Sequence, residues 1–283
     1  MSDLLQFLVS GVGQGCIFAL LASGFVVIHR VTNVVNMAQG TFAVVGGMMC
    51  YSFIAAGLPR GVAEVVAVLL AGLIGVAAGY VTIGRKGLVP LASLIVSFGI
   101  VIFAYAVEIA IWGDQPISFD GWTGAFQVGE VRVQKQYILI VGVTMLTFTV
   151  LEAFFNYTYA GKALTACHMN PYAASLLGID TLRMGLWSFF IAGVLGGMAG
   201  VLIAPIQSVS FDSDVHLALN GFAAAVMGGL LHPRAALIGA IALGIASELV
   251  AGYLNAAYKM DVTLALMLAA IAWRMRNRSL EAA

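Results

Sequence analysis

Charge is what this sequence has least of. Only 9% of its 283 residues are Asp, Glu, Lys or Arg, against about 25% in soluble domains. The thirteen basic and thirteen acidic residues cancel, so the chain has no net field that would attract nucleic acid. Because 61% of the residues are hydrophobic, the soluble globular class is excluded. The composition indicates a protein that resides in lipid.

Catalytic motifs are also lacking. The stretch nearest to the nucleotide-binding pattern G-x-x-x-x-G-K-[ST] has Asn156 at its first glycine position and Ala163 at its hydroxyl position. Neither the zinc-protease pair H-E-x-x-H nor the serine nucleophile elbow G-x-S-x-G occurs. We therefore expect no catalytic residues, and no ATP hydrolysis by the chain itself.

Cysteine is scarce as well. Cys16, Cys50 and Cys167 are too few and too scattered for a disulfide framework or a zinc site. We expect them to pack as small apolar residues, with no metal and no cofactor held by the chain.

Long apolar runs are what the sequence does have, and they predict an all-α polytopic membrane protein. About 20 apolar residues span a bilayer, and a β-barrel would instead show short alternating strands. The N-terminal run exceeds a signal-peptide core of roughly 7–15 residues and lacks a basic start, so we expect it to be the first span. The predicted spans, eight or nine in number, are 5–28, 36–57, 62–84, 90–112, 137–158, 184–205, 217–231, 235–256 and 262–274. The seventh and the ninth are short enough to be half-helices or re-entrant segments.

Basic residues predict how the chain is oriented. On one side of the alternating spans lie Arg30, Arg85, Lys86, Lys162, Arg183, Arg234, Arg274, Arg276 and Arg278. On the other lie Arg60, Arg132, Lys135 and Lys259, along with the longest loop, 113–136. The richer side is expected to be cytoplasmic, which places the N-terminus outside and the C-terminus inside.

Small residues recur at helical spacing within these spans. Glycines four apart let helix backbones approach closely, and they occur at Gly11 and Gly15, Gly75 and Gly79, Gly193 and Gly197, and Gly196 and Gly200. We expect tight packing within one bundle rather than a specific dimer.

Acidic residues inside the spans are candidates for function, since an ionisable group in lipid is costly. Glu248 lies deepest, near the middle of the 235–256 span, whereas Glu152 and Glu108 can more easily reach an interface. Each of them can line a solute path or simply bond to a neighbouring helix.

Two glycine-rich segments in different halves of the chain share a pattern. Gly40-Thr-Phe-Ala-Val-Val-Gly46-Gly47 follows Asn36 and Gln39, and Gly221-Phe-Ala-Ala-Ala-Val-Met-Gly228-Gly229 follows Asn220. Glycine-interrupted segments in corresponding halves point to a transporter's pathway, although chance similarity is an alternative. We expect Asn36, Gln39, Asn220 and Glu248 to line the pathway or its gate.

Residues 159–183 form a half-polar segment that the topology places in the cytoplasm. Lys162 to Met169 is predicted to be a short helix, and Asn170-Pro171 starts a second, since asparagine is a favoured N-cap and proline a favoured first residue. The second helix is predicted to end at Leu177, before Gly178. The segment is either a docking surface or an ordinary interfacial linker.

This segment resembles the cytoplasmic loop of permeases in the branched-chain amino acid family of ATP-binding cassette importers. Matching positions are Gly161, Lys162, Ala163, Leu164, Ala166, Asn170, Pro171, Ala173, Ala174, Leu177, Gly178 and Ile179. NMAQG at Asn36 to Gly40 resembles the family's N-F-A-Q/H-G, and 185–205 resembles its glycine-rich span after the loop. The resemblance covers most of the chain and is closest to the smaller of the two permease subunits.

The chain departs from the family pattern at three places. Thr165 stands at a position usually held by arginine, and Thr41 at a position usually acidic. The family's G-G-x-G turn reads Gly228-Gly229-Leu-Leu-His232-Pro233-Arg234 here. The first departure puts one contact to an ATPase in doubt, and the other two concern the pathway and the substrate.

The resemblance implies one permease domain over 1–283, in a bacterial plasma (inner) membrane, that imports branched-chain amino acids or related small polar solutes. It also implies a second homologous permease, two ATP-binding subunits gripping 161–179, and an external solute-binding protein. A stand-alone ion-coupled transporter or channel is the alternative, with Glu152 and Glu248 as the only seeds of an ion site.

Overall fold

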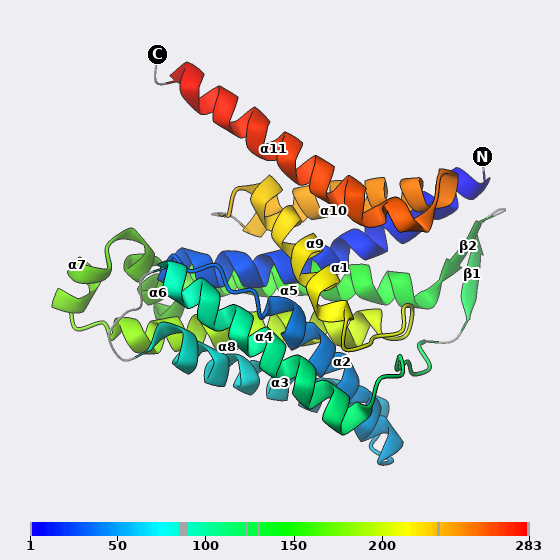
Figure 1. The fold of residues 1–283 in the computed structure, drawn as a ribbon, viewed down its shortest axis with the longest axis horizontal. Helices are drawn as coiled ribbons and strands as arrows, with labels where there is room; N and C mark the ends of the chain where they lie inside the picture. Colours follow the sequence, from blue (N-terminus) through cyan, green and yellow to red (C-terminus); the bar gives the residue numbers. More distant parts are fainter. Residues whose placement is uncertain (1, 85–89, 123, 129–130, 231–232, 282–283) are drawn as a thin grey trace.

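The computed structural model describes the chain except for residues 1, 85–89, 123, 129–130, 231–232 and 282–283. Helices make up most of it (Figure 1). In chain order they are α1 (Ser2–Thr32), α2 (Gln39–Ala55), α3 (Arg60–Ile83), α4 (Pro90–Trp112), α5 (Lys135–Tyr157), α6 (Tyr159–Met169), α7 (Pro171–Leu176), α8 (Thr181–Ile203), α9 (Ser213–Gly228), α10 (Pro233–Tyr253), the 3-10 turn η1 (Ala256–Tyr258) and α11 (Lys259–Glu281).

Each predicted span coincides with a helix, so the all-α prediction is confirmed. Six described helices are long and apolar enough to cross a membrane, namely α1, α3, α4, α5, α8 and α10. The apolar helix α2 has 17 residues, about 26 Å at 1.5 Å per residue, which is short of a bilayer core of about 30 Å. The higher count of eight or nine spans stays a prediction.

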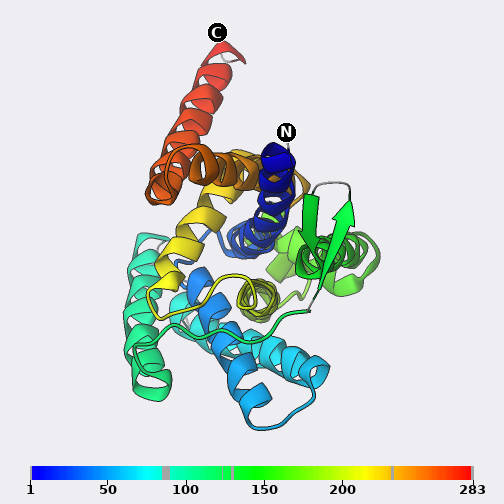
Figure 2. The ribbon, with the colours of Figure 1, turned by 90° about the vertical axis from the view of Figure 1, so that its right-hand side faces the viewer.

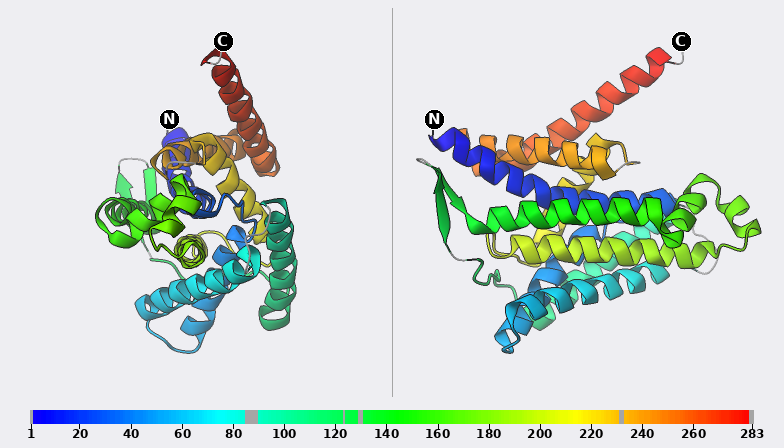
Figure 3. Two further views of the ribbon diagram at one scale, coloured as in Figure 1. Left: turned by 90° about the vertical axis from the view of Figure 1, so that its left-hand side faces the viewer. Right: turned by 180° about the vertical axis from the view of Figure 1, so that it is seen from behind.

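A β-hairpin interrupts the helical pattern in the loop 113–136. Its strands β1 (Ala125–Val128) and β2 (Val131–Gln134) pair antiparallel, with Ala125 opposite Gln134. Sequence analysis treated the whole stretch as a loop. The hairpin and the N-terminus lie at one end of the bundle, and α6 and α7 lie at the other (Figure 3).

Helices α1 to α4 and helices α8 to α11 form two corresponding sets. α1 packs on α10 as α8 packs on α3, and α1 packs on α9 as α8 packs on α2. The central helices α1 and α8 contact each other and run in opposite directions (Figures 2 and 3). α2 and α9 therefore hold equivalent places, which explains the shared glycine pattern that the sequence displays in these two segments.

A largely buried non-helical segment, residues 33–38, separates α1 from α2. Here the exposed Asn33 adopts a positive φ of 54°, and three of the backbone N–H groups that follow donate to side chains. Val34 donates to the Thr32 hydroxyl (3.2 Å), Met37 to the Ser97 hydroxyl of α4 (3.2 Å), and Ala38 to the Asn36 side-chain oxygen (3.3 Å). Irregular backbone at membrane depth is tolerated only when the protein supplies such partners.

Glycines bring the helices of this bundle into backbone contact, as the spacing predicts. A Cβ at Gly46 would lie 2.6 Å from the Cα of Gly197, and one at Gly200 would overlap the carbonyl oxygen of Ala43. In the second set, a Cβ at Gly15 would lie 2.7 Å from the Cα of Ile241. The crossings of α2 with α8, and of α1 with α10, therefore exclude any larger residue at these positions.

We expect Gly200→Ala to destabilise the bundle, because the new methyl group would push α2 away from α8. Overpacking of this kind costs about 1–3 kcal/mol, so the melting temperature in detergent should fall. Gly99→Ala is the control, since no atom lies within 4 Å of a Cβ at that position. Equal melting temperatures for the two variants would contradict the proposed close crossing.

Candidate functional site

The predicted two-helix loop is confirmed in its geometry. α6 ends at Met169, and the Asn170 side-chain oxygen accepts from the Ala173 backbone N–H (3.0 Å), so that it caps α7. Gly178 follows with a φ of 81°, a left-handed conformation that glycine adopts without steric cost. The chain then enters α8 behind an Asp180 cap. The two short helices project from the end of the bundle (Figure 3).

A small apolar core fixes this loop to the bundle. Leu164 and Cys167 of α6 and Ala174 of α7 are buried with Val31 at the end of α1. Gly161 permits the close approach, since a Cβ there would lie 2.6 Å from the Cα of Phe155. Burial raises the pKa of the Cys167 thiol.

The burial of Leu164 corrects one expectation. The family resemblance places Leu164 in the segment 161–179 that ATP-binding subunits are expected to grip, yet only 1% of Leu164 is exposed. Leu164 is the fourth residue of the matching motif, and the motif alone does not indicate that its side chain faces α1 and α5. Leu164 therefore holds the loop in place and offers no surface.

Apolar side chains nevertheless gather on the outside of the loop. Leu176 is 71% exposed and Leu177 80% exposed, although a leucine normally contributes about 1.5–3 kcal/mol when buried. Tyr159, Met169 and Tyr172 are also exposed, and Lys162 is exposed beside them. Exposed apolar side chains on a protruding segment are typical of interaction sites.

Thr165, the departure from the family pattern in this loop, is half-buried. Its hydroxyl donates to the Gly161 carbonyl within α6 (2.9 Å). The side chain is therefore engaged in its own helix and presents no charge.

Two of the predicted pathway residues lie together. Asn220 of α9 and Glu248 of α10 line one polar cavity of about 280 Å³. Side chains that sequence analysis did not select complete its lining: Gln14, Gln207, His216, Ser247 and Lys259. They come from segments far apart in the chain, so their spacing carried no signal.

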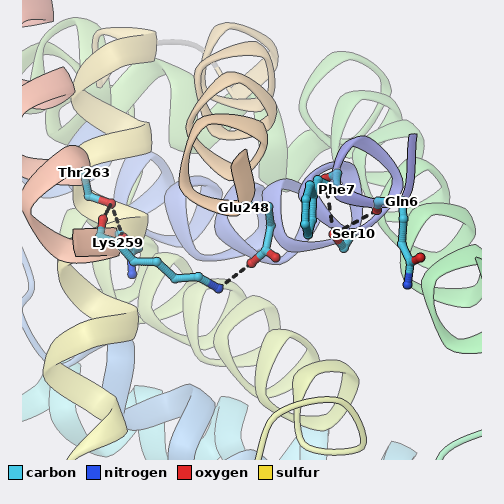
Figure 4. Close-up of polar contacts among 7 residues, drawn as sticks. Gln6, Phe7, Ser10, Glu248, Lys259 and Thr263 are labelled. Atoms are coloured by element: carbon cyan, nitrogen blue, oxygen red, sulfur yellow. Dashed lines mark hydrogen bonds and ion pairs between the residues drawn. The ribbon is translucent and has the colours of Figure 1, made fainter. Parts of the chain in front are cut away.

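The polar groups of this cavity are held by specific contacts. Lys259 Nζ lies 2.6 Å from Glu248 Oε1 (Figure 4). The Thr263 hydroxyl lies 2.8 Å from Asn220 Oδ1 and 3.0 Å from the Lys259 carbonyl. Glu248, the deepest acidic residue by sequence, is thus compensated by a cation from the start of α11.

Asn36 and Gln39 lie elsewhere, fully buried where α1, α2 and α8 meet. Gln39 Nε2 donates to the Ala192 carbonyl of α8 (2.9 Å), and its side chain fills the space beside Gly24. Their observed contacts stabilise the break between α1 and α2.

The other two acidic residues of the spans differ from each other. Glu152 of α5 pairs with Arg234 of α10, whose Nε lies 3.1 Å from Glu152 Oε2. Glu108, which was expected to reach an interface more easily than Glu248, is buried within the bundle, with its side chain 0% exposed. Among the described residues, neither Glu108 oxygen has a hydrogen-bond partner.

The remaining departures from the family pattern have clear neighbours. Thr41 donates its hydroxyl to Asp214 Oδ2 of α9 (3.2 Å). Gly229 ends α9 with a φ of 86°, and Leu230 follows at 59°. Leu231 and His232 of the predicted turn lie outside the described residues, as do Arg85 and Lys86. Within the described part of the chain, no three His, Cys, Asp or Glu side chains group as a metal site.

Comparison with known proteins places this chain in a family. The family model "Branched-chain amino acid transport system / permease component" matches residues 7–271. The high-affinity branched-chain amino acid transport system permease protein LivH of Escherichia coli K12 is 30% identical, covering 93% of this chain and 91% of that protein. BraD of Pseudomonas aeruginosa, named in the same terms, is 28% identical, covering 95% and 94%.

A solved structure shares the fold alone. A chain of PsaBC from Streptococcus pneumoniae in complex with Fab aligns with a TM-score of 0.54 at 15% identity, covering 95% of this chain and 91% of that one. Because the family model spans nearly the whole sequence, the chain belongs to the branched-chain amino acid transport system permease family.

Proposed function

We propose that this chain is the membrane-spanning permease subunit of an ATP-driven importer of branched-chain amino acids or related small polar solutes. The observation that carries this proposal is the capped two-helix loop, whose exposed apolar patch lies on a chain without a nucleotide-binding motif. The whole chain, 1–283, acts as one permease domain in the plasma (inner) membrane of a bacterium.

Energy enters through residues 159–183. Two ATP-binding subunits, which carry out the hydrolysis, would contact Lys162, Leu176 and Leu177 on the exposed side of the loop. The core around Leu164 joins the loop to the ends of α1 and α5, so a push on α7 is transmitted to the central helix as a rigid-body shift. Asn170, Pro171 and Gly178 keep the shape of α7, and Gly161 lets α6 pack closely against α5.

The solute path uses the polar cavity between α1, α9, α10 and α11. Its Gln14, Asn220 and His216 groups offer hydrogen bonds to a polar solute, and Glu248 and Lys259, paired with each other, also line it. Asn36 and Gln39 act one step removed, as gate residues at the break between α1 and α2. An external solute-binding protein delivers the solute, and a second homologous permease completes the path.

The N-terminus, the hairpin and the start of α11 lie outside under this proposal, and the loop α6–α7 and the C-terminus lie in the cytoplasm. Support comes from the basic residues, which favour the side of Lys162 and Arg183 by nine to four in the sequence.

The alternative of a stand-alone ion-coupled transporter fits less well. Its two seeds, Glu152 and Glu248, are each paired with a basic side chain, Arg234 and Lys259. An acidic group that is already neutralised in this way leaves little charge for a coupling ion.

Leu176→Asp combined with Leu177→Asp should abolish binding of the ATP-binding subunits, because two apolar contacts become charged. The loss of two buried leucines at about 1.5–3 kcal/mol each predicts at least a roughly 100-fold weaker Kd in a pull-down titration. Ser175→Asp is the matched control, since it adds charge to the same helix and removes no apolar surface. Unchanged binding by the double variant would refute the docking role.

Asn220→Cys should react with a membrane-impermeant maleimide added from outside, and the transported solute should slow the reaction. The three native thiols are buried, so the wild-type chain provides an unlabelled background. Labelling at a rate that the solute does not change would remove Asn220 from the path.

A further inference from the structure

Two carboxyl groups are buried together near the hairpin end of the bundle. Glu108 of α4 is 0% exposed and Asp214 of α9 is 1% exposed. The Thr41 hydroxyl lies 3.2 Å from Asp214 Oδ2, and the backbone at Val215 also hydrogen-bonds to the Asp214 carboxyl. Within the described part of the chain, neither Glu108 oxygen nor Asp214 Oδ1 has a side-chain partner. Buried polar atoms nearly always have a hydrogen-bond partner, so these three oxygens on two groups call for an explanation.

Several contacts bring these groups to one place. The Tyr105 ring, one turn before Glu108, packs edge-on against Phe211 with centroids 4.8 Å apart, and Phe211 lies three residues before Asp214. Thr41, which bonds to Asp214, lines the same cavity of about 300 Å³ as Glu108. Thr41 therefore links the Asp214 carboxyl to the cavity that Glu108 lines.

Among the residues that the structure describes, no positive charge is paired with the Glu108 or the Asp214 carboxyl group. Asp212 adds a further negative charge beside Asp214. On α4, Tyr105 is the other titratable side chain at the contact with Phe211. The described α2 and α3 residues that line the cavity have no titratable side chains. Two neighbouring carboxylates in such a setting cannot both stay ionised.

The helix ends indicate which of the two is neutral. Asp214 lies in the first turn of α9, where the free N–H groups favour an anion. Glu108 lies near the last turn of α4, where the free carbonyl groups disfavour one. A metal ion is a poorer fit than a proton, because hard cations take about six oxygen ligands, and among the described residues no three His, Cys, Asp or Glu side chains group as a metal site.

We propose that Glu108 and Asp214 form a proton-binding site between α4 and α9, in which protonated Glu108 donates its O–H to the Asp214 carboxylate. This bond gives partners to two of the three oxygens that lack a side-chain partner and leaves one negative charge, shared with Thr41. It also ties α4, which otherwise packs loosely on the bundle, to the short helices α2 and α9.

Infrared spectroscopy of the full-length chain in lipid nanodiscs tests the proposal. At neutral pH the wild type should show the carbonyl stretch of a protonated carboxylic acid, and Glu108→Gln should lose it. The amide is isosteric and still donates to Asp214, so the fold should survive. Glu152→Gln is the matched control and should keep the band, because its carboxylate is paired with Arg234.

A second variant reads the pairing itself without removing Glu108. In Asp214→Asn the band should persist at a higher frequency, because an amide is a weaker acceptor than a carboxylate. The proposal fails if Glu108→Gln leaves the band unchanged or if Asp214→Asn does not move it. It also fails if replacing choline chloride in the buffer with sodium chloride removes the band, since a metal ion would then occupy the site. None of these readouts depends on transport, so they stand apart from the importer assignment.

Discussion

Backbone groups that leave the helical pattern inside a membrane must find partners within the protein, and residues 33–38 meet that demand here. The Thr32 hydroxyl, the Ser97 hydroxyl and the Asn36 side chain accept the three N–H groups described above. Because these partners come from α1, α4 and the segment itself, the break holds three elements together. The path of α2, which begins at the break, and its packing on α8 follow from this arrangement.

The second set of helices repeats the packing arrangement of the first in the opposite direction. α8 leads into the loop before α9 as α1 leads into the break before α2, and α9 packs on α1 as α2 packs on α8. Inverted repeats of this kind allow one site to face either side of a membrane as the two halves exchange arrangements. The polar cavity with Asn220 and Glu248 belongs to the second half, and the buried Asn36 and Gln39 to the first. In the proposed importer the capped loop between the halves would then be well placed to bias that exchange.

Sequence patterns predicted the elements of this fold well where local chemistry decides. Apolar runs predicted every long helix, and Asn170-Pro171 with Gly178 predicted α7 almost to the residue, because caps and left-handed turns are local. What depends on burial was less accessible. Leu164 and Leu177 look alike in the motif, yet one is buried and the other exposed, and Glu108 looked peripheral although it is fully enclosed. Lys259 and Asp214 gave no signal, because their partners Glu248 and Thr41 come from other helices.

In the proposed importer, the chain moves solute only when ATP-binding subunits act on its cytoplasmic loop. The most direct measurement is uptake of a radiolabelled branched-chain amino acid into proteoliposomes. These would contain this chain with its second permease, the ATP-binding subunits and the solute-binding protein, compared with this chain alone. We expect uptake in the full assembly that requires ATP hydrolysis, and none by the chain alone. Uptake by this chain alone without ATP would contradict the importer assignment.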